Sequence, residues 1–283
     1  MTQRPRLSFF ALRPAPELRP WIHSYTILSS AGHVPAGRSG TLVPDGHVEL
    51  GFSCAAPILD RRGDGCWSAR PSSYGARVLD RGSLAQLSGR VDEIAVKLCH
   101  GAAPAVLGVP AGELLAECVP LDALLPAASG LTRRLAATDG LAGRRNLLDA
   151  ALRGICAGAA APDPLVAAAA RWIARSGGRI RVQTIAERLG CTSRTLQLRF
   201  RSAIGLSPGR FAQVRRLRRV VRFIHQHPRG SLALVAHTFG YADQSHFNRE
   251  FRRLVGEPPR QFFAGRPFVS DLLRTGRRRG REG

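Results

Sequence analysis

An internal repeat near the C-terminus most constrains what this chain of 283 residues can fold into. Four pairs of matching residues lie 50 positions apart: Ile185 and Val235, Ala186 and Ala236, Leu189 and Phe239, Gly190 and Gly240. Five more pairs lie 51 positions apart: Leu196 and Phe247, Phe200 and Phe251, Gly205 and Gly256, Pro208 and Pro259, Phe211 and Phe262. The second copy has one more residue in its turn. Matches with this spacing predict one structural unit built twice.

Each copy has the layout of a helix-turn-helix, with a short helix, a turn that contains glycine, and a second helix. Gly190 and Gly240 stand where the first helix must end and the chain must reverse, which favours a positive φ angle. Thr192 and Asp243 are placed to cap the second helices. We expect these helices at about residues 193–204 and 244–255.

The second helix of each copy has one apolar face and one mainly polar face. Leu196 and Phe200, and likewise Phe247 and Phe251, are four positions apart and therefore share a buried face. Arg, Gln and Asn side chains on the other face can hydrogen-bond to base edges in the major groove, and Ser can assist. The outward residues are Arg194, Gln197, Leu198 and Arg201 in the first copy, and Gln244, Ser245, Asn248, Arg249 and Arg252 in the second.

A long helix is predicted between the copies, over residues 209–227. Its apolar stripe is formed by Phe211, Val214, Leu217, Val221 and Ile224, and arginines cover the rest. At about 1.5 Å per residue the helix is roughly 28 Å long, and successive major grooves lie about 34 Å apart. One chain can thus place two helices in adjacent grooves. The predicted phosphate contacts are Arg201, Arg215, Arg216 and Arg252.

Charge is distributed unevenly along the chain. Residues 1–170 hold 17 Lys and Arg against 14 Asp and Glu, a net charge of +3, whereas residues 171–283 hold 25 against 6, a net charge of +19. A preference for Arg over Lys does not explain why acidic residues become scarce in one part only. The asymmetry indicates a nearly neutral domain followed by one that binds a polyanion such as DNA.

The N-terminal half is predicted to be rich in strands. Short β-type segments at 21–29, 47–53, 75–80, 83–89 and 92–99 are separated by turn clusters, as in a sandwich or barrel. Helical periodicity follows at 129–157. The fold class is therefore α+β with two domains. We expect a β-rich domain with a helical extension over 1–157, a linker over 158–164, two helix-turn-helix units joined by a long helix over 165–264, and a basic, disordered tail over 265–283.

The repeated unit resembles the DNA-binding domain of AraC/XylS-type transcriptional regulators. The resemblance covers about residues 165–264 and is carried by "GYADQSHFNREFRRLVGEPPRQF" and its first-copy equivalent "LGCTSRTLQLRFRSAIGLSPGRF". Transferred by motif position, it implies base contacts by Arg194, Gln197, Leu198, Gln244, Ser245, His246 and Arg249. Leu198 stands where many members of the family have Arg. At that position, base reading by the first copy departs from the family pattern.

The resemblance also implies the remaining functional expectations. A weaker similarity of residues 7–155 to the β-rich region of such regulators implies that the N-terminal domain senses a small molecule, mediates dimerisation, or both. The expected partners are operator or promoter DNA, RNA polymerase, a small-molecule effector and a second copy of the chain. No cofactor and no catalytic activity are expected. The identity of the effector, the operator and the sign of regulation stay open.

Three other interpretations are less favoured: a metal site, a reactive-cysteine domain and RNA binding. His23, His33, His47 and His100, with Asp45 or Glu49, lack a compact His-x-His spacing, so structural histidines are expected instead of a metal site. Some alkylation-repair proteins fuse a reactive-cysteine domain to the same DNA-binding unit, and this is the alternative function. It requires four clustered thiols, and these cysteines are scattered: Cys54, Cys66, Cys99 and Cys118. RNA binding would favour exposed aromatic residues, whereas Phe247 and Phe251 are on the buried face.

The six cysteines form no Cys-x-x-Cys pair, which fits a reducing compartment. The N-terminal "LSFFAL" is too short for the core of a signal peptide, and no apolar run approaches the length of a membrane span. The expected location is therefore the cytoplasm, at the nucleoid.

Overall fold

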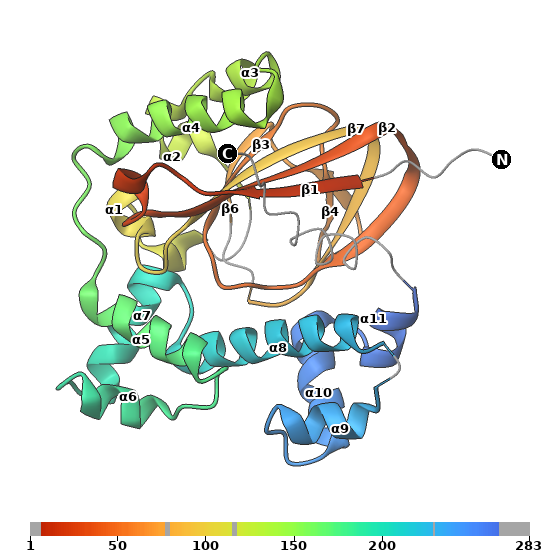
Figure 1. Ribbon diagram of the computed structural model, residues 1–283, viewed down its shortest axis with the longest axis vertical. Coiled ribbons are helices and arrows are strands. Elements are labelled where there is room, and N and C mark those ends of the chain that lie inside the picture. The colour runs from red at the N-terminus through yellow and green to blue at the C-terminus, as the bar shows by residue number, and fades with distance from the viewer. Residues whose placement is uncertain (1–6, 77–79, 115–117, 229, 266–283) are drawn as a thin grey trace.

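The computed structural model describes residues 7–76, 80–114, 118–228 and 230–265. It consists of an antiparallel sheet with short helices, followed by a domain made only of helices (Figure 1). This arrangement confirms the predicted fold class. The predicted disordered tail at 265–283 lies outside the described residues, apart from Gly265. None of the helices within the described ranges is long and apolar enough to cross a membrane.

Eight strands form the sheet. Its main path runs β1 (Leu7–Leu12), β2 (Ile22–Leu42), β7 (Ser83–Leu98), β3 (Glu49–Ser53), β6 (Ser73–Ala76) and β8 (Val119–Pro120), and β7 also pairs with the hairpin β4 (Leu59–Arg61) and β5 (Trp67–Ala69). All pairings are antiparallel, for example Leu50 with Val96 and Tyr25 with Val96. Alternation along β7 places Ile94, Val96 and Leu98 in the core.

Two strands are longer than the sequence predicts. β2 continues through a segment rich in glycine and proline, because register shifts at Ser29–His33 and Val34–Arg38 accommodate the residues that do not fit the ladder. Gly32 and Gly37 have φ angles of +120° and +87° there. The predicted strands at 83–89 and 92–99 are one strand, β7. The sequence prediction missed β1 and the β4–β5 hairpin, since both are short and lack clear alternation.

Short helices and the longer α4 follow the sheet and cover one end of it (Figure 1). They are α1 (Ala103–Leu107), the 3-10 helix η2 (Ala111–Leu114), α2 (Leu121–Leu124), α3 (Leu131–Ala136) and α4 (Gly140–Cys156). Asp149 of α4 is buried and accepts hydrogen bonds from Tyr25 Oη at 2.7 Å and from the Ala15 amide at 3.0 Å. The helical extension is thus fixed to β2.

The helical domain begins at a capped helix. The Asp163 side chain accepts from the amides of Leu165 and Val166, and Pro164 occupies the first helical position of α5 (Pro164–Arg175). The helices that follow are α6 (Val182–Arg188), α7 (Ser193–Ile204), α8 (Pro208–Gln226), α9 (Leu232–Thr238), α10 (Gln244–Val255) and α11 (Pro259–Gly265). Figure 1 shows α8 crossing below the sheet from the α6–α7 unit to the α9–α10 unit.

Two hydrophobic clusters connect the helical domain to the sheet. One joins Phe52 and Ile94 of the sheet to Phe200 and Phe211, around the first helix-turn-helix unit. The other joins Val34 and Leu87 to Phe247, around the second unit. Each unit therefore shares its core with a different part of the N-terminal domain. The predicted domain boundaries themselves stay a prediction.

Candidate nucleic-acid interface

α7 is the second helix of the first unit. Gly190 has a φ angle of +64° at the turn, and the Thr192 hydroxyl caps α7 by accepting from the Thr195 amide at 3.0 Å. Leu196 and Phe200 are fully buried, so the opposite face of the helix points away from the core. That face carries the predicted residues Arg194, Gln197, Leu198 and Arg201, all of them exposed.

Leu198 is one of the most exposed large apolar side chains in the part of the chain that the structure describes. It retains 59% of its accessible surface, whereas Leu196, two residues earlier, is fully buried. Leu198 therefore does not belong to the core, and it lies on the same face as Arg194 and Arg201.

α10 is the second helix of the second unit and repeats this construction. Gly240 has a φ angle of +75°, and the Asp243 carboxylate caps the helix by accepting from the His246 amide at 2.6 Å. Phe247 and Phe251 are buried, and their rings contact each other edge to face at 5.6 Å. Both second helices have the bounds that the sequence predicts.

The predicted polar face of α10 is only partly exposed to solvent. Ser245, Arg249 and Arg252 are exposed, and Gln244 is half-buried at the first helical position. Asn248 is half-buried as well, and its Oδ1 atom is buried with no hydrogen-bond partner within the described residues. The most exposed part of this face thus runs from Ser245 through Arg249 to Arg252.

His246 is occupied by contacts within its own unit. Its Nδ1 atom accepts a hydrogen bond from the Ala242 amide at 3.3 Å, so a neutral ring carries its proton on Nε2. Nε2 lies 4.0 Å from the Glu250 carboxylate, and Tyr241 meets the ring edge to face. These contacts orient His246 along the helix N-terminus, and the sequence analysis did not predict them.

Arg215 and Arg216, two predicted phosphate contacts on α8, are half-buried. Arg215 donates to the Asp45 carbonyl at 3.5 Å and lies beside the Phe211 ring, so it faces the N-terminal domain. Arg216 donates to the Gly178 carbonyl at 3.1 Å and lies over the Tyr241 ring at 5.2 Å. Sequence position on a basic helix could not reveal these partners, because they come from distant segments.

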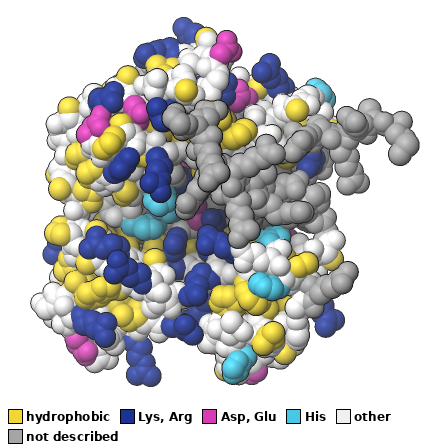
Figure 2. Space-filling view, viewed as in Figure 1, with side chains coloured by type: hydrophobic (Ala, Val, Ile, Leu, Met, Phe, Trp, Pro, Cys, Tyr) yellow, Lys and Arg dark blue, Asp and Glu magenta, His cyan; other side chains and the backbone are white. Residues whose placement is uncertain are grey.

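Basic side chains nevertheless dominate the helical domain. Figure 2 shows Lys and Arg gathered across the lower half of the molecule, in the region of α8 and the two units. The exposed arginines of α8 include Arg219 and Arg222, beyond those on the second helices. The local charge therefore favours a polyanion along this part of the surface.

Comparison with known proteins separates the chain into two matched regions. Residues 185–265 match a family described as Helix-turn-helix domain, and residues 11–120 match one described as Domain of unknown function (DUF6597). The HTH-type transcriptional activator RhaS of Escherichia fergusonii is 36% identical over 85 residues. The C-terminal domain is of the AraC/XylS type. The match covers 30% of this chain and 30% of the RhaS chain.

Solved structures resemble the whole chain only distantly. ToxT from Vibrio cholerae O395 is 9% identical, with a TM-score of 0.45, and the match covers 93% of this chain and 98% of that one. The AraC-like transcriptional activator CuxR is 15% identical, with a TM-score of 0.28, over 77% of this chain and 86% of that one.

Proposed function

We propose that the chain is a sequence-specific DNA-binding transcription regulator that places α7 and α10 in adjacent major grooves. The observation that carries this proposal is the presence of two capped AraC/XylS-type helices, each with a buried apolar face and an exposed basic face, at the two ends of α8. α8 has 19 residues, which corresponds to about 28 Å. That length suits grooves about 34 Å apart on one side of the duplex.

The proposed base-reading residues are the predicted ones, except for His246. In the first unit they are Arg194, Gln197 and Leu198, and in the second unit Gln244, Ser245 and Arg249. Arg and Gln suit guanine and adenine edges respectively, and Leu198 suits the methyl group of thymine. His246 is proposed to position the start of α10, since its ring is held by Ala242 and Glu250.

Phosphate contacts are proposed for Arg201 and Arg252, which are exposed and occupy the same position in the two copies. Contacts to phosphates fix the register of a protein on the duplex without reading its sequence. Arg215 and Arg216 are proposed to stabilise the packing of α8, because each already lies against a carbonyl and an aromatic ring.

The N-terminal domain is proposed to sense a small molecule or to mediate dimerisation, and RNA polymerase is proposed as a partner of the bound regulator. The support for these roles is the AraC/XylS-type C-terminal domain and the transcriptional activator that matches it. Sensing, dimerisation and contact with RNA polymerase are activities of a whole regulator. The match to RhaS covers only the DNA-binding part of each chain.

The alternative of a cysteine-dependent alkylation sensor is disfavoured by the state of its thiols. Burial, together with the nearby Asp92 carboxylate, raises the pKa of Cys54 to about 12. Burial also raises the pKa of Cys99 to about 11. Such thiols are poor nucleophiles at neutral pH, because the thiolate is the reactive form. In the described part of the chain, no three His, Cys, Asp or Glu residues are grouped so as to hold a metal ion.

Selection of binding sites from random duplex DNA, followed by a salt titration on the selected site, tests the proposal. We expect two short conserved half-sites about one helical turn apart. Neutralising roughly six to ten phosphates predicts a slope of about −5 to −9 for log K against log salt. A slope near zero, or the absence of any preferred site, would contradict the proposed function.

A further inference from the structure

Three histidines from separate segments of the N-terminal domain form a stack. His23 lies in β2, His47 lies in the loop before β3, and His100 follows β7. The ring centroids are 4.6 Å apart between His23 and His47, and 4.1 Å apart between His47 and His100. His23 is the exposed end of the stack, His47 is buried, and His100 is half-buried. Figure 2 shows histidine side chains in a hollow above the basic helices.

The inner end of the stack meets the DNA-binding domain. The ring of His100 contacts Phe211 of α8 edge to face at 4.8 Å, and Phe211 contacts Phe200 of α7 at 5.4 Å. A continuous series of ring contacts therefore joins the sheet to the buried face of the first reading helix. Gly46 has a φ angle of +76°, and a Cβ atom there would lie 2.7 Å from the Phe211 ring. The loop that holds His47 thus packs directly on α8.

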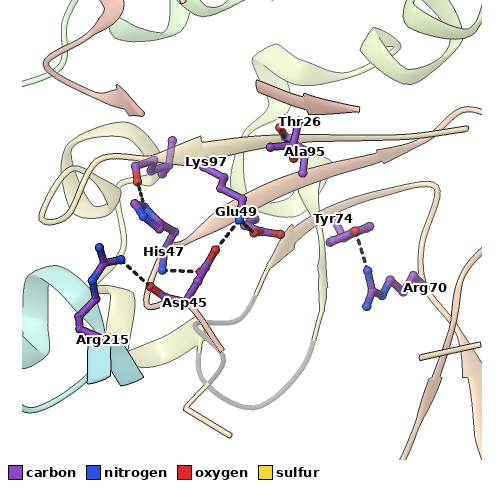
Figure 3. A network of polar contacts seen from close by, with 10 residues as sticks. Thr26, Asp45, His47, Glu49, Arg70, Tyr74, Ala95, Lys97 and Arg215 are labelled. Atoms are coloured by element: carbon purple, nitrogen blue, oxygen red, sulfur yellow. Dashed lines mark hydrogen bonds and ion pairs between the residues drawn. The ribbon is translucent and has the colours of Figure 1, made fainter. Parts of the chain in front are cut away.

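The charged groups around the stack leave an excess of positive charge. Lys97 forms ion pairs with Asp45 and with Glu49, the latter at 2.8 Å, and Arg215 donates to the Asp45 carbonyl (Figure 3). Arg218 acts electrostatically on Asp45 and Lys97. These three cations face two carboxylates, so the local charge is already +1 when the histidines are neutral. Arg222, which acts on Arg215, adds to the excess.

The hydrogen bonds of the two inner rings determine which nitrogen would take a second proton. The Nδ1 atom of His47 donates to the Leu98 carbonyl at 2.9 Å, so Nε2 is the unprotonated nitrogen. The Nδ1 atom of His100 is buried and has no hydrogen-bond partner among the described residues. With both nitrogens protonated, Nδ1 of His100 would be a charged donor with no acceptor among the described residues, and such a group is costly to bury.

The pKa directions agree with this geometry. Burial lowers the pKa of His47 to about 4, although the Asp45 carboxylate opposes the shift. Burial and the Lys97 ammonium lower the pKa of His23. Burial, His47 and Arg215 hold the pKa of His100 well below its usual value.

We propose that the His23–His47–His100 stack is an acid-sensitive contact that holds the first helix-turn-helix unit against the N-terminal domain and releases it when the rings take up protons. The released state exposes the rings to water, where a histidine has a pKa of about 6.5. It therefore binds more protons than the docked state. Docking is strongest above pH 6.5 and weakens as the pH falls from there toward 4.

The size of the effect follows from the two pKa values of His47. Between pH 7.5 and pH 5.5 this residue alone lowers the docking equilibrium constant about tenfold, from a released-state pKa of about 6.5 and a docked-state pKa of about 4. His23 and His100 act in the same direction. The inference goes beyond the proposed function, because docking is measured without DNA.

Small-angle scattering of the full-length chain at pH 7.5 and pH 5.5 tests the proposal. We expect the radius of gyration of the wild type to increase at pH 5.5, and that of the triple variant His23→Gln, His47→Gln, His100→Gln to stay constant. Glutamine keeps a polar side chain but cannot take up a proton. The matched control is His33→Gln, an exposed residue of β2 outside the stack, which should behave as the wild type.

A second measurement needs no substitution within the stack. In the wild-type chain the ring NMR signals of three histidines should titrate together, below pH 6.5, with the same midpoint as the change in radius. A wild-type radius that is equal at both pH values would overturn the proposal. So would a triple variant that expands as the wild type does, or stack signals that titrate independently near pH 6.5 with no change in radius.

Discussion

The two helix-turn-helix units share caps, turns and a buried face, but they are held in the molecule in different ways. In the first unit, α7 lies against α1 and η2 of the N-terminal domain, and Phe200 joins the ring contacts that lead to the histidine stack. In the second unit, Phe251 contacts three other phenylalanine rings of its own unit. The same repeated backbone therefore places its buried phenylalanine in a different environment in each unit.

Their outward faces differ at equivalent positions too. Leu198 and Arg249 lie 51 residues apart, so they are the same position of the repeat, and both are exposed. Arg199 and Glu250 also occupy one position of the repeat, but only Arg199 is exposed. Arg199 binds the Asp163 carboxylate that caps α5, whereas Glu250 points to the buried side of α10. From this difference we propose that the second unit is the stronger base reader.

The largest expected effect comes from replacing a buried phenylalanine with alanine at the same position of each unit. Phe251→Ala and Phe200→Ala should each cost about 3–5 kcal/mol of unfolding free energy. Phe251→Ala should unfold mainly the second unit, because its ring contacts lie within that unit. Phe200→Ala should also loosen the N-terminal domain, because the ring contacts of Phe200 lead through Phe211 to His100 of that domain.

Hydrogen exchange measured peptide by peptide distinguishes the two outcomes. Loss of protection restricted to the second unit in Phe251→Ala, and extending to the sheet in Phe200→Ala, is the expected pattern. Identical patterns in the two variants would remove the distinction between the units.

The next effect concerns base reading by the second unit. Arg249→Ala should weaken binding to the selected site by about 1–3 kcal/mol and relax the preference at one base pair. Arg252→Ala, on the same helix, should weaken binding to all sequences about equally. Affinities on selected and on random duplexes give the measurement. If both variants lose affinity equally on both duplexes, the division between base and phosphate contacts fails.

A smaller effect is expected at the equivalent position of the first unit. Leu198→Arg should move the preference of that unit from thymine toward guanine, because Arg can bind O6 and N7 of guanine together. Site selection with the variant and the wild type gives the measurement, and Arg249→Leu is the reciprocal control. Unchanged preferred sites for Leu198→Arg would show that Leu198 does not face the groove.

The smallest expected effect is the loss of stability when the capping side chain of either second helix is removed. Thr192→Ala and Asp243→Ala should each cost about 0.5–2 kcal/mol. The loss should be larger for Asp243, whose carboxylate also interacts with the positive end of the helix dipole. Chemical denaturation of the full-length chain measures both. A larger loss in Thr192→Ala would mean that its hydrogen bond to the Thr195 hydroxyl at 2.9 Å contributes more than the charge does.

Sequence reasoning was most successful where the structure depends on neighbouring residues. It predicted α7 and α10 with the bounds that the structure shows, because a cap, a turn glycine and an apolar pair four positions apart all act within one or two helical turns. It was less successful in the sheet. Gly37 and Pro35 indicate a turn by composition, but bulges opposite β7 let β2 continue through them.

The candidate site shows the same limit. The exposure of Arg194, Gln197, Leu198 and Arg249 follows from helical periodicity and was predictable. The hydrogen bonds of Arg215 and Arg216 were not predictable, because their acceptors, the backbone carbonyls of Asp45 and Gly178, lie far away in the sequence.

The sequence by itself determined the repeated unit, its caps, its two faces and the concentration of positive charge in the helical domain, because these depend on local spacing and on composition. Only the tertiary structure decided which arginines remain exposed and which residues join the domains. His23, His47, His100 and Phe211 come from four separate segments, and each looks like an ordinary polar or core residue in its own segment. Their contact exists only because β2, β7 and α8 pack together and bury the His47 and Phe211 rings between them.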